Sequence, residues 1–123
     1  MTKQEFCEEY LGRVWHRADF NCFDLVRDSF RLIDDVELRH VTDEAFAIDT
    51  VRSDYTRCKR QEGAVFHCYD SNGNWVHIGR ILMGKAFHAV RDGCVCFWEL
   101  DALERMYKMQ GGRVEYTLPK GVK

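Results

Sequence analysis

Apolar and polar positions follow a helical period over the first half of the chain and change to strand-like runs in the second half. Residues 2–9 and 22–33 carry apolar side chains about one helical turn apart, which predicts two amphipathic helices. Thr2 opens the first segment and Asn21 precedes the second, and both residue types are favourable helix N-caps. A third stretch with the same spacing predicts a helix over residues 42–58.

Short apolar runs separated by turn sequences follow from residue 64 onward, and they are typical of an antiparallel meander. A helical segment and a final strand complete the chain, and we expect the final strand at the edge of the sheet. Helices first and paired strands second favour an α+β fold in one domain that spans residues 1–123. The predicted segments are strands over 64–69, 75–82, 85–91 and 94–98, a helix over 101–109 and a strand over 114–118.

Composition narrows the class of protein. The hydrophobic fraction of 46%, with 13% aromatic residues, excludes an intrinsically disordered chain. A formal net charge of −2 argues against a nucleic-acid partner, because dedicated binders of nucleic acids are basic. No apolar run reaches the ~18–20 residues of a membrane span. The polar, acidic start MTKQEFCEEY shows no secretory signal, so we expect synthesis in the cytoplasm.

Six cysteines are many for 123 residues. Disulfides are not expected in a reducing compartment. None of the cysteines forms the C-x2-C pair of a zinc ribbon, and Cys94 and Cys96 supply only two ligands on one strand. We therefore predict no metal and no cofactor, and we interpret most of these thiols as small buried apolar groups.

Cys22 differs from the other cysteines because it stands in the first turn of a predicted helix, in the segment FNCFDLVRDSF. The helix dipole and the N–H groups of a first turn stabilise a thiolate, and the same N–H groups can stabilise an oxyanion. This position favours a nucleophilic cysteine. A core cysteine at the start of an amphipathic helix is the alternative that the position alone leaves open.

Two histidines supply the base that such a thiol needs. A two-residue connection at Met83-Gly84 pairs Gly79 with His88, and His77 then lies diagonally from His88 on the same sheet face. The distance between such diagonal neighbours is ~7–8 Å. One imidazole can take the thiol proton while the second orients the first. The alternative for each histidine is a structural, half-buried strand residue.

The remaining histidines are weaker candidates. A tight turn on Asn72-Gly73 puts His67 on the face opposite to that of His77, whereas one more loop residue puts both on one face. His16 lies in a predicted loop that could border a site, and His40 lies between two predicted helices.

Five short segments carry a further pattern in this order: Y-L-G-R-V-W, N-C-F-D-L-V-R, E-G-A-V-F, H-I-G-R-I-L and F-H-A. The pattern spans roughly residues 5–90 and resembles that of the NlpC-type cysteine peptidases, most closely their short phage-tail members. The resemblance implies a papain-like α+β fold, in which Cys22 is the nucleophile, His77 the general base and His88 the orienting residue.

The same resemblance implies residues at the substrate. Trp15 matches an aromatic position beside the nucleophile, and His16 follows it where the family often has glycine. The family motif D-C-S-G-L or D-C-x-G-L has a glycine where this chain has Asp24. That change adds bulk and a negative charge, and a nearby carboxylate disfavours a thiolate. We expect Trp15, His16 and Asp24 to border the substrate.

The function that the resemblance implies is hydrolysis of peptide bonds in bacterial cell-wall peptidoglycan, typically between D-glutamate and a diamino acid. The partner would be a peptidoglycan stem peptide, in the setting of a virion tail with other phage-tail proteins. The altered motif around Asp24 motivates an alternative, a catalytically inactive tail-assembly protein that retains the fold. A different thiol reaction, such as acyl transfer, is a third hypothesis.

Overall fold

The computed structural model describes residues 1–39 and 51–122. In these residues an antiparallel sheet of six strands has the order β1-β6-β2-β3-β4-β5. The strands are β1 (Tyr55–Arg57), β2 (Val65–Tyr69), β3 (Trp75–Leu82), β4 (Lys85–Ala89), β5 (Val95–Trp98) and β6 (Arg113–Pro119). The helical segments are α1 (Lys3–Tyr10), α2 (Cys22–Ser29), the π-helical turn η1 (Phe30–Asp34) and α4 (Leu100–Met109). The fold is therefore mixed α+β, as the periodicity predicts.

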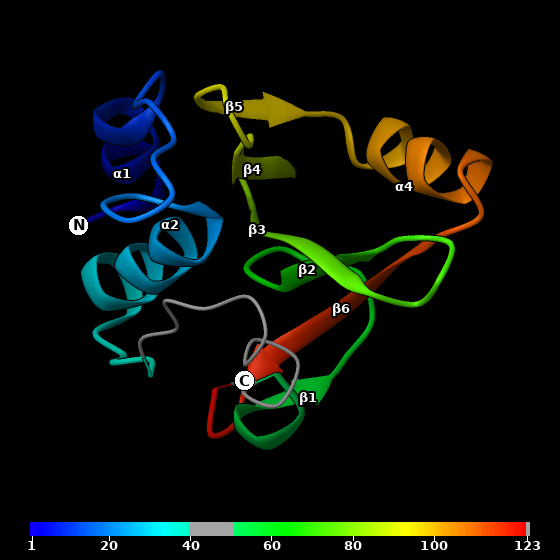
Figure 1. Cartoon of the computed structure of the whole chain (residues 1–123). Helices are drawn as coiled ribbons and strands as arrows, with labels where there is room; N and C mark the ends of the chain where they lie inside the picture. The colour runs from blue at the N-terminus through cyan, green and yellow to red at the C-terminus, as the bar shows by residue number, and fades with distance from the viewer. Residues whose placement is uncertain (40–50, 123) are drawn as a thin grey trace.

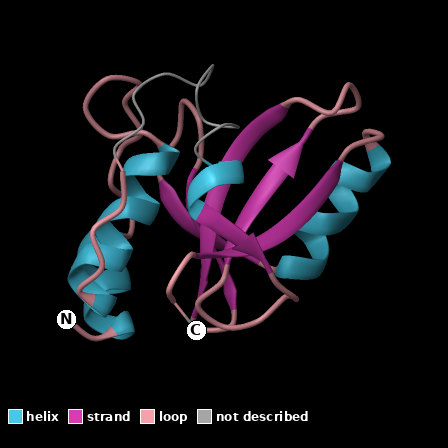
Figure 2. Cartoon of the chain, turned by 90° about the horizontal axis from the view of Figure 1, so that it is seen from below, coloured by secondary structure: helices cyan, strands magenta, loops and turns pink. Residues whose placement is uncertain are grey.

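Helices cover both faces of the sheet (Figures 1 and 2). Phe6 of α1 and Leu25 of α2 are buried in one core cluster with Phe87 of β4. On the other face, Leu103 of α4 is buried with Phe66 of β2. These two faces hold separate apolar cores, and a side chain can reach only one of them from a given strand position.

Both predicted helix starts are confirmed. Thr2 Oγ1 accepts a hydrogen bond from the Glu5 N–H (3.1 Å), and the Thr2 N–H donates to Glu5 Oε1 (2.9 Å). The second helix begins with the same reciprocal capping box, formed by Asn21 and Asp24. The cap determines which residue opens α2, and that residue is Cys22.

The predicted helix over 22–33 is α-helical only as far as Ser29, and the π-helical turn η1 begins at Phe30. The buried guanidinium of Arg80 lies 3.6 Å from the Phe30 ring centroid, and its Nη1 is 2.7 Å from Asp34 Oδ2. Arg80 Nε also donates to the Gly63 carbonyl at 2.9 Å. The wider π turn thus lets two of its residues meet one buried cation, which a purely helical period does not reveal.

Two predictions about the sheet are wrong. The helix predicted over 42–58 ends early: residues 51–54 are helical, but β1 begins at Tyr55. Residues 40–50 of that prediction lie outside the described residues. The final strand is not an edge strand, because β6 lies between β1 and β2, with Tyr55 opposite Pro119 and Val65 opposite Thr117. Pairing between strands this distant in sequence leaves no local periodicity to detect.

The connection between β3 and β4 is the two-residue turn that the sequence predicts. Met83 and Gly84 both have positive φ, 56° and 75°, as a type I′ hairpin turn requires. The Glu62 carboxylate accepts hydrogen bonds from both of their N–H groups, at 3.0 and 2.8 Å. This turn sets the register in which Leu82 lies opposite Lys85. No helix within the described ranges is long and apolar enough to cross a membrane.

Candidate active site

The first turn of α2 presents Cys22 at the N-terminal end of the helix. The Asp24 N–H donates to Asn21 Oδ1, and the Asn21 N–H donates to Asp24 Oδ2, each at 3.0 Å. These bonds hold the turn rigidly and leave the half-buried Cys22 as the first helical residue. The positive end of the helix dipole lies at this residue, and such a position favours a thiolate.

The start of α2 lies where the sheet divides into two parts. In the described chain β3 and β4 pair at three positions only, from Arg80 opposite Phe87 to Leu82 opposite Lys85. Beyond them β3 stays paired with β2, and β4 with β5 (Figure 1). Cys22 packs against the core cluster that includes β4 and β5 and also against the one that includes β2 and β3. Cys22 therefore contacts both parts of the sheet from the side that α2 covers.

The two histidines meet across the same division. The predicted pairing of Gly79 with His88 lies one step beyond the last paired residues of β3 and β4. His77 Nε2 and His88 Nδ1 form a hydrogen bond of 2.8 Å, and their ring centroids are 5.0 Å apart. A Cβ atom built on Gly79 would lie 2.8 Å from the Cβ of His88 and 2.1 Å from the Phe66 ring. Gly79 is thus required where Phe66 and His88 approach the β3 backbone closely. The prediction that His77 and His88 share a face is confirmed.

Burial keeps the pair in its neutral form. His77 and His88 are 9% and 1% exposed. Burial lowers the pKa of both imidazoles, and His77 lowers the pKa of His88 further. A neutral imidazole has one ring nitrogen with a lone pair and one with a proton, so the ring that donates the shared hydrogen bond keeps a lone pair on its other nitrogen. The pair therefore has the chemistry of a base with an orienting partner.

Cys68 and Tyr107 link the histidine face to Cys22. Cys68 lies directly opposite His77 in the β2–β3 ladder, so the two side chains share a face. The Tyr107 hydroxyl of α4 is hydrogen-bonded to the Cys68 thiol, and burial raises the pKa of that thiol to about 12. The charge of Cys22 contributes to the raised pKa of both Cys68 and Tyr107. Cys22 is thus within electrostatic reach of groups beside His77.

Sequence reasoning missed Tyr107 because helical periodicity does not tell which sheet face a helix covers. A polar side chain on the helix predicted over 101–109 is the only signal that the sequence carries for it.

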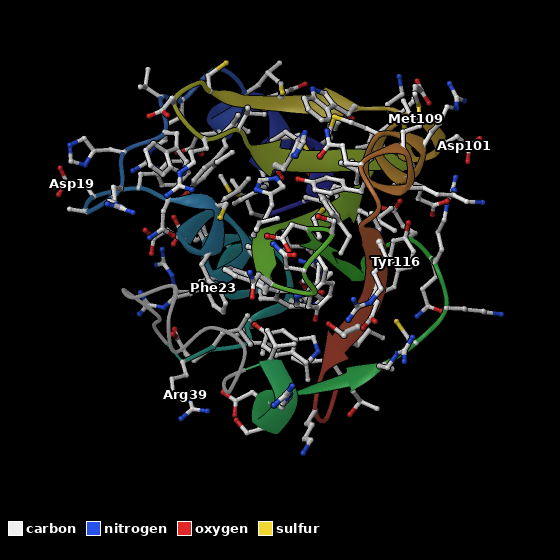
Figure 3. All side chains as sticks on the ribbon, turned by 45° about the vertical axis from the view of Figure 1, so that its right-hand side comes forward. Asp19, Phe23, Arg39, Asp101, Met109 and Tyr116 are labelled. Carbon is white, nitrogen blue, oxygen red and sulfur yellow. The ribbon has the colours of Figure 1, made fainter. Side chains whose placement is uncertain are left out.

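The three predicted substrate residues lie on the loop and turn around the start of α2. Trp15 packs against the same cluster as Cys22, and the guanidinium of Arg91 is 5.8 Å from its ring centroid. The Asp24 carboxylate belongs to the capping box described above. His16 is exposed, and its Nδ1 accepts a hydrogen bond from the N–H of Asp19 at 3.2 Å. Asp19 lies at the outer edge of this loop (Figure 3). A role of these residues in substrate binding stays a prediction.

The other histidines lie elsewhere. His67 is opposite Ile78, one residue out of phase with the pair Cys68 and His77, so it lies on the face opposite to that of His77. This is the outcome expected for a tight turn. Both of its ring nitrogens are bonded, to Thr117 Oγ1 at 2.6 Å and to the Trp75 indole N–H at 3.2 Å. His40 lies outside the described residues.

Among the described residues no group of three or more His, Cys, Asp or Glu side chains is arranged to hold a metal ion. Scans of the chain against models of known protein families and against curated proteins return no match.

Proposed function

We propose that the chain is a cysteine peptidase or amidase that hydrolyses peptide bonds of bacterial cell-wall peptidoglycan with Cys22, His77 and His88. The observation that carries the proposal is the 2.8 Å hydrogen bond between the two buried histidines, which share a sheet face with Cys68, a residue within electrostatic reach of Cys22. A thiol at a helix N-terminus and an oriented imidazole are the two components that a cysteine nucleophile requires. The motif order around Cys22, His77 and His88 supports an NlpC-type peptidase with a papain-like fold.

Each residue has a defined step in this reaction. His77 accepts the proton of Cys22, and the thiolate attacks the scissile carbonyl carbon to form a tetrahedral oxyanion. N–H groups of the first turn of α2 donate to that oxyanion. The intermediate collapses as the C–N bond breaks, and His77 gives its proton to the leaving amine. Water then hydrolyses the thioester with His77 again as the base, which releases the acid and restores the thiol.

His88 supports His77 throughout this cycle. When His77 takes up the thiol proton it becomes an imidazolium in a buried site, and a hydrogen bond to a neutral acceptor stabilises that charge. His88 Nδ1 is this acceptor at 2.8 Å. The same bond holds the His77 ring in one orientation and leaves its other nitrogen for the thiol proton in this proposal.

The substrate class rests on the resemblance and on the residues around α2. The proposed substrate is a peptidoglycan stem peptide, cleaved between D-glutamate and a diamino acid, and the proposed setting is a phage tail. Trp15 packs against the same core cluster as Cys22, and we propose that its ring offers an apolar surface to the peptide. Arg91 near the Trp15 ring adds a positive charge that suits the carboxylates of a stem peptide.

Digestion of purified peptidoglycan tests the proposal directly. Wild-type protein should release soluble fragments whose masses and new amino termini identify one cleaved bond. Cys22→Ser should release none, and His67→Gln should retain activity because His67 lies on the opposite face of the sheet. Equal release by wild type and Cys22→Ser would exclude a thiol mechanism.

A second measurement needs no substrate. Iodoacetamide labelling at pH values from 6 to 9, followed by peptide mapping, compares the thiols within one molecule. Cys22 should react fastest below the ordinary thiol pKa of ~8.5, and His77→Gln should slow it selectively. If Cys22 reacts no faster than the exposed Cys94, the thiol is not activated.

Asp24 favours a second candidate, a tail-assembly protein that keeps the fold without turnover. Its carboxylate is held in the first turn of α2, where it adds a negative charge next to the thiol. In that case Cys22→Ala would leave assembly of infectious particles unchanged. Asp24→Gly distinguishes the candidates further, since it should speed iodoacetamide labelling of Cys22 if the carboxylate is what suppresses the thiolate.

A further inference from the structure

The second ring nitrogen of His88 is the one polar atom of the histidine pair whose surroundings the proposed mechanism does not explain. His88 is 1% exposed, and its Nε2 has no hydrogen-bond partner among the residues that the structure describes. Buried polar atoms without a partner are rare and costly, so the groups around Nε2 decide whether it carries a proton or a lone pair.

Aromatic rings enclose His88. The Trp98 ring centroid is 4.5 Å from that of His88 with an interplanar angle of 81°, and the Phe66 centroid is 5.7 Å away at 64°. Both contacts are edge-to-face. Trp98 reaches this position because Cys96 lies directly opposite His88, and Trp98 is the next residue of β5 on the same face.

The only hydrogen-bonding atom of Trp98 is already used. Its indole N–H is hydrogen-bonded to the Cys96 thiol. An indole has no acceptor atom, so the only part of Trp98 that can attract a proton on His88 Nε2 is the negative face of its ring system. A proton on His88 Nε2 is attracted to such a face, whereas a lone pair is repelled by it.

The proton on His88 determines the proton on His77. If His88 carries its proton on Nε2, its Nδ1 must accept the hydrogen bond, and His77 must donate from Nε2. His77 Nδ1 then holds a lone pair. In the opposite tautomers His88 donates from Nδ1, and His77 carries its proton on Nδ1, which cannot accept another one.

We propose that Trp98 is a positioning residue, whose indole holds the proton of His88 on Nε2 and thereby leaves His77 Nδ1 as the lone pair that accepts the Cys22 proton. The choice of tautomer does not depend on whether the protein cleaves peptidoglycan. Only its catalytic consequence rests on the proposed function.

Nitrogen NMR of histidine-labelled protein tests this directly, with no substrate present. Long-range correlations between ring protons and ring nitrogens at pH 7 report which nitrogen of each histidine is protonated. In wild type, His77 and His88 should both show a protonated Nε2 and a bare Nδ1. Trp98→Phe should keep this pattern because an aromatic face remains, whereas Trp98→Leu should raise the Nδ1-protonated fraction of His77 about three- to fivefold.

His67 serves as the internal control, because it lies on the other face and should give the same signals in all three proteins. A wild-type spectrum with His77 protonated on Nδ1 would overturn the inference, even if neither variant folds. Equal tautomer fractions in the Phe and Leu variants would overturn it as well. A correct tautomer without peptidoglycan cleavage would contradict the proposed function and leave the role of Trp98 intact.

Discussion

His67 and the pair His77 and His88 lie on adjacent strands of one sheet, yet the hydrogen bonds and ring contacts around them differ. The Trp75 indole N–H donates to His67 Nδ1, so His67 Nε2 carries the proton that Thr117 Oγ1 accepts. Every polar atom of the His67 ring is therefore satisfied. His77 and His88 instead bond each other beside the rings of Phe66 and Trp98, and one nitrogen of His88 lacks a partner within the described residues.

Burial alone therefore does not distinguish the proposed catalytic histidines from His67. Burial lowers the pKa of His67, to about 4, as it lowers that of His77 and His88. What differs is the use of the ring lone pairs. The lone pair of His67 Nδ1 accepts from the Trp75 indole, whereas the proposed mechanism leaves a lone pair of His77 for the thiol proton. Substitutions at the two sites should therefore affect different properties, namely stability at His67 and turnover at the pair.

Replacement of His77 should produce the largest effect. His77→Gln and Cys22→Ser are each expected to lower the rate of peptidoglycan cleavage by about 10⁴-fold or more, since base and nucleophile act as one unit. His67→Gln should leave the rate per folded molecule within about twofold. Initial rates on the same peptidoglycan preparation, normalised to folded protein by circular dichroism, measure this contrast.

If His67→Gln lowers the rate as strongly as His77→Gln while the protein stays folded, the division between the two sites fails. A loss caused by partial unfolding would be distinguished by its recovery at lower temperature.

His88 should show an intermediate effect that depends on the replacement. His88→Leu removes the acceptor of the His77 hydrogen bond and is expected to slow cleavage at least about a hundredfold. His88→Asn keeps an oxygen that can accept from His77 Nε2 and should retain more activity. The ratio of kcat for the two variants measures the orienting hydrogen bond, and equal kcat values would show that His88 serves only to fill space.

The sequence predicts the histidine pair well because the information for it is local. The Met83-Gly84 turn sets the register of one hairpin, and strand periodicity then puts His77 and His88 on one face. The cap at Asn21 similarly identifies Cys22 as the opening residue of α2. Neither conclusion needs knowledge of the rest of the fold.

The surroundings of the pair could not be predicted because they depend on contacts between distant segments. Trp98 reaches His88 through the β4–β5 pairing, and Tyr107 reaches Cys68 because α4 packs on that face. Tyr55 belongs to a strand only because β6 is available to pair with it. Figure 3 shows this C-terminal part, with Tyr116 of β6 beside α4. The hydrophobic periodicity of a single segment carries no information about which distant segment pairs with it.

Acid should unfold the protein partly through His67. Its pKa is about 4 in the folded state and ~6.5 in an unfolded chain, so the unfolded state binds more protons at low pH. The stability that depends on neutral His67 is present above pH ~6.5 and is lost as the pH falls toward 4, by about 3 kcal/mol. His67→Gln removes this titration, so its stability should fall less than that of wild type between pH 7 and pH 4.

Urea unfolding at half-unit pH intervals measures both curves. The loss that remains in His67→Gln reports His77 and His88, whose pKa values burial lowers in the same direction. If the unfolding free energies of wild type and His67→Gln depend on pH in parallel, burial does not hold His67 in its neutral form.

Substitution of Gly79 by Ala should have the smallest effect on stability, and it tests the structure around the histidine pair most directly. A methyl group at this position would lie 2.1 and 2.4 Å from two atoms of the Phe66 ring and 2.8 Å from His88 Cβ, so the ring must move. Gly79→Ala is expected to cost about 1–3 kcal/mol, the usual range for an overfilled core. Because Phe66 contacts both histidine rings, the NMR signals of His77 and His88 should shift. The NMR signals of His67 should not shift, because a change confined to one face of the sheet does not reach the groups that hold the His67 ring on the other face. A larger shift at His67 than at the pair would refute the separation of the two sites.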